Sequence, residues 1–165
     1  MKLARFCRHV FALPGAVARA FPRTAFDDIE KAIHETETRH GGEIRVAVDA
    51  VLEPLPLLRG QSARERAVQA FAELGVWDTE QNNGVLLYLL LADRDVEIVA
   101  DRGFNGKVTH AEWEDVCRAM EAGLRAGRHA PAVVEGVRRI AAIMARHFPP
   151  RAREPNELPD RPAVL

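Results

Sequence analysis

Two groups of oxygen-bearing side chains are the residues of this sequence best suited to chemistry. The group we rank first surrounds an Asn-Asn-Gly turn, and its members are Asp78, Asn82, Asn83 and Asp101. The members of the second group are Asp49, Glu53, Asp93 and Asp95. Carboxylate, amide and carbonyl oxygens are the ligands of Ca²⁺ and Mg²⁺, so each group is a candidate cation site. Turns are rich in Asp and Asn for conformational reasons alone, and a structural role stays open for both groups.

The enzymatic alternative is a weak metal-dependent phosphatase, which is implied by the family resemblance described below and not by the spacing of these residues. Such an enzyme needs a nucleophile or an activated water, and a positive charge or metal that holds the phosphoryl oxygens. Asp93 or Asp49 would be the nucleophile or metal ligand, and Arg94 or Arg102 would bind the phosphoryl group. The sequence contains none of the patterns GxSxG, GxxxxGK[ST], HExxH and GxGxxG. We therefore rank a non-catalytic module that binds a cation or a protein first, the phosphatase second and a purely structural subunit third.

Cysteines, histidines and net charge narrow the possibilities further. Cys7 and Cys117 form no CxxC pair, and Cys117 lies on an apolar helix stripe, which predicts a core residue. The histidines are dispersed and are expected at the surface or at helix caps; they are His9, His34, His40, His110, His129 and His147. With 23 Lys and Arg against 24 Asp and Glu, the chain lacks the basic excess of a nucleic-acid-binding domain.

The elements that position these residues follow from hydrophobic periodicity. A helix capped by Thr24 and ended by Gly41-Gly42 precedes a strand over 43–51, in which apolar and polar residues alternate. Pro54 and Pro56 predict a loop. Ser62 with Glu65 forms a capping box that opens the next helix. The apolar run at 85–91 predicts a strand covered on both faces.

The second half of the folded region continues with a hairpin and two helices. A short turn at 92–95 leads into an alternating return strand over 95–101. Thr109 and Glu112 form another capping box, and a last helix covers 131–148 with Pro131 in its first turn. The strand–helix–strand unit over 43–91 predicts a right-handed crossover between parallel strands. We therefore expect a three-layer α/β/α sandwich around a small mixed sheet.

This topology predicts where the two groups lie. Parallel strands bring the second group to the carboxyl edge of the sheet, where open α/β sheets bind ligands. The return strand is antiparallel, so Asp101 and Arg102 would lie beside the start of the central strand. There they would join the rest of the first group and Glu43.

The two ends of the chain differ from the folded middle. Residues 1–23 are basic and partly apolar, and we expect a short helix or a disordered lead-in there; a signal peptide or a segment that rests on an anionic membrane is the alternative. Residues 149–165 contain half of the ten prolines and no apolar stripe, which predicts a mobile tail. The division is therefore 1–23, a folded domain over 24–148, and a tail over 149–165.

Four segments carry a resemblance to a known family. They are FAELGVW at 71–77, NNGVLL at 82–87, Asp93-Arg94 and EIVADRG at 97–103. Together with the final helix pair they make residues 25–148 similar to the TPM domain, in its short soluble bacterial type. The resemblance implies a three-layer sandwich, binding of Ca²⁺ or Mg²⁺, and the phosphatase activity proposed for plant members.

The resemblance also implies partners and a location. Relatives of this type are often encoded near LemA-like and membrane-bound TPM proteins, which are the protein partners we expect. The expected location is the cytoplasm, with at most peripheral contact with the inner membrane and with export disfavoured. Asp78 and Asp101 are the candidate ligands closest to the matching motifs.

Overall fold

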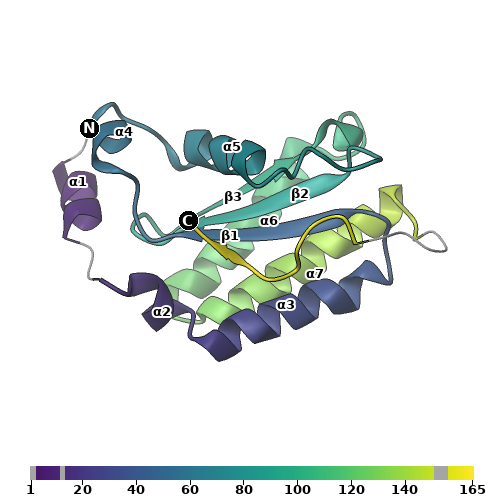
Figure 1. Cartoon of the computed structure of the whole chain (residues 1–165), viewed down its shortest axis with the longest axis horizontal. Helices are drawn as coiled ribbons and strands as arrows, with labels where there is room; N and C mark the ends of the chain where they lie inside the picture. Colours follow the sequence, from purple (N-terminus) through teal and green to yellow (C-terminus); the bar gives the residue numbers. More distant parts are fainter. Residues whose placement is uncertain (1–2, 12–13, 151–155) are drawn as a thin grey trace.

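The fold is built on one mixed sheet of four strands. A computed structural model describes residues 3–11, 14–150 and 156–165. The strands are β1 (Glu43–Asp49), β2 (Gly84–Leu90), β3 (Asp95–Ala100) and β4 (Ala163–Val164), in the order β3-β2-β1-β4 (Figure 1). β1 is parallel to β2 and β4, whereas β2 and β3 are antiparallel. The parallel pairing of β1 with β2 and the antiparallel return strand are as the sequence predicts.

Helices cover both faces of this sheet (Figure 1). One face packs on α3 (Arg23–Glu37), α6 (His110–Arg125) and α7 (His129–His147), and the other packs on α5 (Ala63–Glu73) and α4 (Pro54–Leu58). The remaining helices are α1 (Leu3–Val10), α2 (Ala16–Ala20) and a 3₁₀ turn, η1 (Arg102–Phe104). The predicted three-layer α/β/α sandwich is confirmed.

Alternation along the strands divides the core between the two faces. Val85, Leu87 and Leu89 contact the α3–α6–α7 layer, whereas Leu86 and Tyr88 contact the α5 layer. Every residue of β2 is buried. This explains the uninterrupted apolar run at 85–91, because a strand inside a covered sheet has no solvent face.

Capping boxes set the starts of α5 and α6. Both predicted capping boxes form, with Ser62 and Thr109 accepting from the backbone N–H groups of Glu65 and Glu112. Two predictions are wrong. Thr24 does not cap α3, because the helix begins at Arg23 after an extended Pro22. Pro54 opens the short helix α4 in place of a loop, which its fixed φ permits in a first turn.

The prediction of a mobile tail is wrong for residues 156–165. Strand β4 pairs with β1, Leu158 is buried against the α5 side of the core, and Arg161 forms ion pairs with Asp27 and Glu30 at 3.0 and 2.6 Å. The free edge of β1 supplies backbone partners that a proline-rich segment without periodicity can still use. Residues 151–155 lie outside the described residues.

Residues 3–11 and 14–23 contain the short helices α1 and α2, in agreement with the helical alternative for the N-terminal segment. Residues 1–2 and 12–13 of this segment lie outside the described residues. α1 contacts α4 and lies at the same end of the molecule (Figure 1). Helix α1 therefore lies beside the carboxyl ends of β1 and β2, a position that the sequence patterns do not predict.

Candidate functional site

The Asn-Asn-Gly turn and the end of β3 lie side by side, as the antiparallel pairing requires. Asp101 donates its backbone N–H to Gly84 O at 2.9 Å, and Gly103 donates its own to Asn82 O at 2.9 Å. A Cβ atom on Gly103 would lie 2.3 Å from Asn82 O, so only glycine permits this approach. The structure therefore places Asn82, Asn83 and Asp101 at one end of the sheet, where β2 begins and β3 ends.

The side chains of this first group are tied to nearby parts of the chain. Asn82 Oδ1 accepts a hydrogen bond from Arg102 Nε at 2.8 Å, and Asp101 Oδ1 accepts one from the Arg102 backbone N–H at 2.7 Å. Asn83 Nδ2 donates to Gly41 O on the β1 side. Arg102 is therefore fastened to the turn, which does not favour the predicted role of a phosphoryl clamp.

Two oxygens of the first group are buried without a hydrogen-bond donor from the described residues. They are Asn83 Oδ1 and Asp101 Oδ2. A buried acceptor without a partner costs about 1–3 kcal/mol, so water or a cation at either atom would be favourable. Asp78, the remaining member of the group, is exposed in the preceding turn.

Asp49, in the second group, is held by a tyrosine and an arginine. Its Oδ2 accepts from Tyr88 Oη at 2.8 Å and from Arg66 Nε at 3.0 Å, and the residue is buried. Burial, and then the Asp49 charge, raise the pKa of Tyr88, which keeps the phenol protonated as the donor. Asp49 is thus part of a satisfied buried network beneath α5, a setting typical of structural carboxylates.

Asp93 is held by three basic side chains of α1. Its carboxylate lies 2.8 Å from Arg5 Nε, 2.8 Å from Arg8 Nη2 and 3.2 Å from His9 Nε2. His9 Nδ1 also accepts the backbone N–H of Leu52 at 2.9 Å. Burial acts to raise the pKa of Asp93, but hydrogen bonds from Arg8, Arg5 and His9 outweigh burial and lower it. Asp93 fastens the N-terminal helix to the β2–β3 hairpin.

The rest of the second group does not converge with Asp49 and Asp93. Glu53 and Arg94 are exposed. Asp95 lines a separate groove of about 550 Å³ along β3 and α6. Burial, followed by repulsion from Glu97 and Glu121, raises the pKa of Asp95 to about 6. The four carboxylates therefore do not form a joint cation site.

The interpretation of Cys117 as a core residue agrees with the structure. Its side chain packs against the main hydrophobic cluster. Burial, and then the charges of Glu97 and Glu121, raise the pKa of the thiol to about 12. A thiol with such a pKa is protonated at neutral pH and does not act as a nucleophile.

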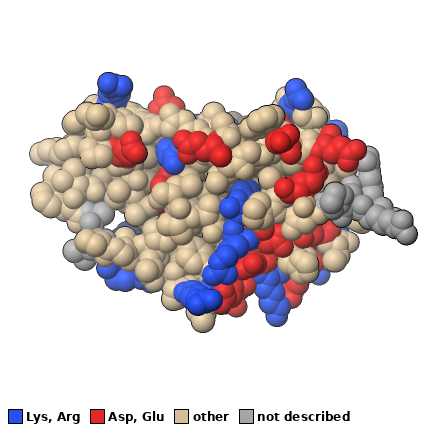
Figure 2. Space-filling view, in the orientation of Figure 1, with Lys and Arg blue, Asp and Glu red and all other residues tan. Residues whose placement is uncertain are grey.

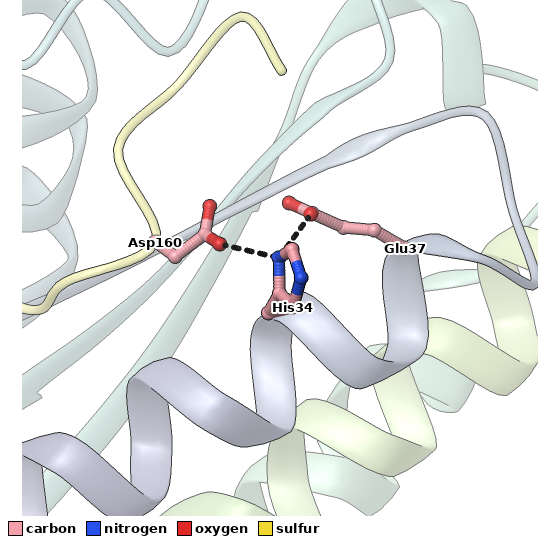
Figure 3. Close-up of side chains that lie close together, drawn as sticks. All are labelled: His34, Glu37 and Asp160. Atoms are coloured by element: carbon pink, nitrogen blue, oxygen red, sulfur yellow. Dashed lines mark ion pairs between the residues drawn. The ribbon is translucent and has the colours of Figure 1, made fainter. Parts of the chain in front are cut away.

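A cluster that the sequence did not predict lies between α3 and the C-terminal segment. His34 Nδ1 is 3.7 Å from Glu37 Oε2 and 3.4 Å from Asp160 Oδ2 (Figure 3). One ligand atom from each of the three residues lies within 4.8 Å of the other two. Within the described ranges, no other set of three His, Cys, Asp or Glu residues converges in this way.

Glu37 lies close to two other carboxylates, Asp160 and Glu43, and their charges disfavour a negative charge on Glu37. Burial, then repulsion from Asp160 and Glu43, raise the pKa of Glu37 to about 8. Burial raises the pKa of Glu43 as well, although two backbone N–H groups oppose the rise. A proton on Glu37 would allow a side-chain hydrogen bond with Asp160, which adds to the rise of the Glu37 pKa.

The C-terminal segment is held beside β1 by backbone contacts. The carboxylate oxygens of Glu43 accept the backbone N–H groups of Glu157 and Leu158, each at 3.2 Å. Arg45 Nη1 donates to Pro159 O at 2.6 Å and also to Arg161 O. These bonds fix the backbone on both sides of Asp160, so the position of its carboxylate is set by β1.

One signal in the sequence points to part of this cluster. His34 and Glu37 are three residues apart, a spacing that puts two side chains on the same face of a helix. Asp160 has no comparable signal, because it lies far along the chain in a segment without hydrophobic periodicity. The histidines are expected at the surface or at helix caps, and this expectation does not predict the contacts of His34 with Glu37 and Asp160.

The chain belongs to the TPM domain family, whose model matches residues 17–143. The match ends before Asp160, so one member of the cluster lies beyond the matched region. No curated protein matches the chain. None of the described helices combines the length and apolar composition needed to cross a membrane.

Solved structures with the same fold include three bacterial proteins. BA42 of the psychrophilic Bizionia argentinensis is 26% identical, with a TM-score of 0.77 and coverage of 88% of this chain and 95% of BA42. The N-terminal domain of a protein from P. gingivalis is 16% identical, with a TM-score of 0.64 and coverage of 83% and 85%. The N-terminal domain of cg2496 from Corynebacterium glutamicum is 14% identical, with a TM-score of 0.56 and coverage of 83% and 82%.

Proposed function

We propose that this TPM domain is a non-catalytic module that binds one divalent cation between α3 and the C-terminal segment. The ligands are His34, Glu37 and Asp160. The observation that carries the proposal is the convergence of an imidazole nitrogen and two carboxylate oxygens within 4.8 Å (Figure 3). Ligand atoms about 2 Å from one metal ion lie within about 4 Å of each other, so small side-chain rotations would complete the site.

The charge of the cluster supports a cation there. Asp160 raises the pKa of both Glu37 and Glu43, and Glu43 also raises the pKa of Glu37. Arg45 donates to backbone carbonyls of the C-terminal segment and is also close enough to interact with the charge of Asp160. A divalent cation would displace the proton of Glu37 and offset the repulsion between the carboxylates.

The donor set indicates which cation fits. Ca²⁺ and Mg²⁺ prefer all-oxygen sites, whereas imidazole suits Zn²⁺ and similar first-row metals. One nitrogen and two oxygens with open remaining positions are typical of Zn²⁺ or Mn²⁺. Ca²⁺ or Mg²⁺ has separate support at the Asn-Asn-Gly edge, where Asp101 Oδ2 and Asn83 Oδ1 are buried oxygens without a donor from the described residues.

The location of the cluster suggests what the cation does. His34 and Glu37 lie on α3, and Asp160 lies on the segment that leads into β4. A shared ion would join α3 to the C-terminal segment at a second point, beside the ion pairs of Arg161 with Asp27 and Glu30. Cation binding would therefore stabilise the packing of the C-terminal segment on the sheet.

The phosphatase alternative has less support from the geometry. Its two candidate nucleophiles, Asp49 and Asp93, are engaged by Arg66 with Tyr88 and by the basic side chains of α1. Each carboxylate has a structural role in the fold. This favours the binding module over an aspartate nucleophile at either position.

Isothermal titration calorimetry of the metal-free chain tests the proposal. We expect Zn²⁺ or Mn²⁺ to bind with one-to-one stoichiometry, and the affinity to fall at least tenfold in Asp160→Asn and in His34→Ala. The matched control is Glu35→Gln, because Glu35 lies on the same helix, is exposed and pairs only weakly with Lys31 at 3.7 Å. The control should bind as tightly as the unchanged chain.

Two results would contradict the assignment of the site. One is the absence of binding heat for Zn²⁺ and Mn²⁺ at millimolar concentration. The other is binding that is unchanged in Asp160→Asn and His34→Ala. Binding of Ca²⁺ or Mg²⁺ that is lost in Asp101→Asn would instead place the cation at the Asn-Asn-Gly edge.

A further inference from the structure

Helix α1 is docked with its polar side toward the protein. Arg5, Arg8 and His9 all contact Asp93, and His9 is buried. Arg5 also donates to Gln61 O at 2.8 Å, and Arg8 donates to Ala92 O at 3.0 Å. These contacts fix the rotation of the helix about its axis, because all three side chains must reach the same hairpin.

The side of α1 that carries Leu3, Val10 and Phe11 is apolar and faces solvent, whereas Phe6 packs against the α5 side of the core. Leu3, Cys7, Val10 and Phe11 recur at helical spacing, and Phe11 continues the last turn through its bond to Cys7 O at 2.9 Å. Leu3 is 76% exposed and Phe11 is 77% exposed. An amphipathic helix on a globular domain normally buries its apolar stripe, but here only Phe6 packs on the core and three large apolar side chains remain exposed.

Helix α4 extends the same apolar surface. It contacts α1 and exposes Leu55 and Leu58, while Leu57 between them is buried. Five of the nine large hydrophobic side chains that are exposed in the described residues therefore belong to α1, its last turn and α4; they are Leu3, Val10, Phe11, Leu55 and Leu58. We call these five residues the terminal apolar patch.

The charges around the patch are mainly positive. Arg8 is 54% exposed at its edge, and Arg59 and Arg94 are exposed on the adjoining turns, against one exposed acid, Glu53. Acidic side chains gather elsewhere: in Figure 2, whose orientation matches Figure 1, the red residues concentrate away from the end that carries α1 and α4. Apolar side chains with cationic neighbours are complementary to a bilayer surface with anionic headgroups.

We propose that the terminal apolar patch docks on the interface of an anionic lipid bilayer. Leu3, Phe11 and Leu58 would enter the boundary between headgroups and acyl chains, while Arg59 and Arg94 would contact lipid phosphates. The ion pairs of Asp93 hold the helix with its apolar stripe outward, so the protein presents the surface already formed. Because only a few side chains are inserted, binding is reversible and depends on anionic lipid and on salt.

Co-sedimentation with lipid vesicles tests this inference. The purified full chain is mixed with vesicles of phosphatidylcholine alone or with 30 mol% phosphatidylglycerol, a composition of roughly physiological anionic content. We expect partitioning onto the anionic vesicles to be at least tenfold stronger than onto the neutral ones. The double variant Leu3→Ser/Phe11→Ser should lose at least tenfold of that binding. The control is Val68→Ser, an exposed apolar residue on α5, which should bind normally.

A second pair of variants separates lipid docking from self-association. Leu55→Ser/Leu58→Ser leaves α1 unchanged and should weaken vesicle binding to a similar extent. The inference is overturned if the unchanged chain does not sediment with anionic vesicles, or if Leu3→Ser/Phe11→Ser sediments as well as Val68→Ser. It is also overturned if the chain is a dimer in solution that these substitutions convert to a monomer, because a second copy would then cover the patch.

Discussion

The two terminal segments of this protein are fastened to the same sheet by opposite electrostatic arrangements. At the N-terminal end, one carboxylate, Asp93, faces three basic side chains of α1. At the C-terminal end, Glu37 and Asp160 lie together beside Glu43 and one imidazole, His34. The first arrangement is complete in itself, whereas the second has an excess of negative charge. Clusters with such an excess are where an added cation contributes most to stability.

The pKa directions express the same contrast. Hydrogen bonds from basic groups lower the pKa of Asp93 despite its burial, but burial and neighbouring carboxylates raise the pKa of Glu37 to about 8. A lowered carboxyl pKa stabilises the fold above its unfolded value, and a raised one makes the fold less stable as pH rises. The two ends should therefore respond in opposite ways to pH.

The largest effect is expected from removal of the Asp93 carboxylate. Asp93→Ala would leave Arg5 and Arg8 without their shared anion and His9 Nε2 without its nearby carboxylate, at a cost of about 3 kcal/mol in the free energy of unfolding. Urea denaturation measures this loss. Asp115→Ala is the control, because Asp115 forms an exposed pair with Arg118 and its loss should cost less than about 1 kcal/mol. Equal losses in the two variants would contradict a structural role for Asp93.

The next effect concerns the packing of the C-terminal segment. Leu158 is buried against the α5 side of the core, so Leu158→Ala should cost about 2 kcal/mol, at the lower limit for buried leucines because the cavity lies near the edge of the sheet. The measurement is again urea denaturation. A change below about 0.5 kcal/mol would mean that residues 156–165 do not pack on the sheet in solution.

A smaller effect is expected from pH in the metal-free chain. The folded chain keeps the proton of Glu37 to about pH 8, while the unfolded chain releases it near its ordinary pKa of 4.5. The native state thus binds more protons over this range, and its stability should fall as pH rises from about 5 to 8. In Glu37→Gln this part of the fall should disappear, and in Glu35→Gln it should remain. Unfolding curves at pH 5.5 and 8.5 in the presence of a chelator make the comparison.

The Asp93 end should show the opposite dependence at acid pH. Because the pKa of Asp93 is lowered, its stabilising contribution is present above the unfolded value of about 3.9 and is lost as pH falls through the lower folded value. The protection factors of the α1 amides against hydrogen exchange, which are corrected for the intrinsic pH dependence of exchange, should therefore fall between pH 5 and 2 before those of β2 do. Protection of α1 that falls only together with that of β2 would contradict the role of Asp93 in holding α1.

Most of the fold follows from local patterns in the sequence. Alternation along β1, the buried run of β2 and the two capping boxes fix the elements because each is determined by residues close together in the chain. β4 was missed because a strand of two residues has no periodicity to detect. It forms because β1 offers a free edge, a property of the folded sheet that the segment itself does not encode.

The site was less predictable for the same reason. Placing Asp49 and Asp93 at the carboxyl end of neighbouring strands was a sound inference from topology, but Arg66 and the basic residues of α1 engage them, and side-chain pairing is invisible in strand order. His34 and Glu37 are three residues apart, a spacing that is common on helices and does not by itself indicate a metal site. Asp160 joins them only because Glu43 and Arg45 hold the backbone around it.

Paramagnetic broadening of backbone amide signals by Mn²⁺ tests the central claim most directly. In nuclear magnetic resonance spectra of the metal-free chain, a substoichiometric amount of Mn²⁺ should first broaden the amides of residues 33–38 and 158–161. Asp160→Asn should abolish this local loss of signal. Broadening that begins instead around residues 82–83 and 101, or that affects all exposed carboxylates alike, would contradict a cation site between α3 and the C-terminal segment.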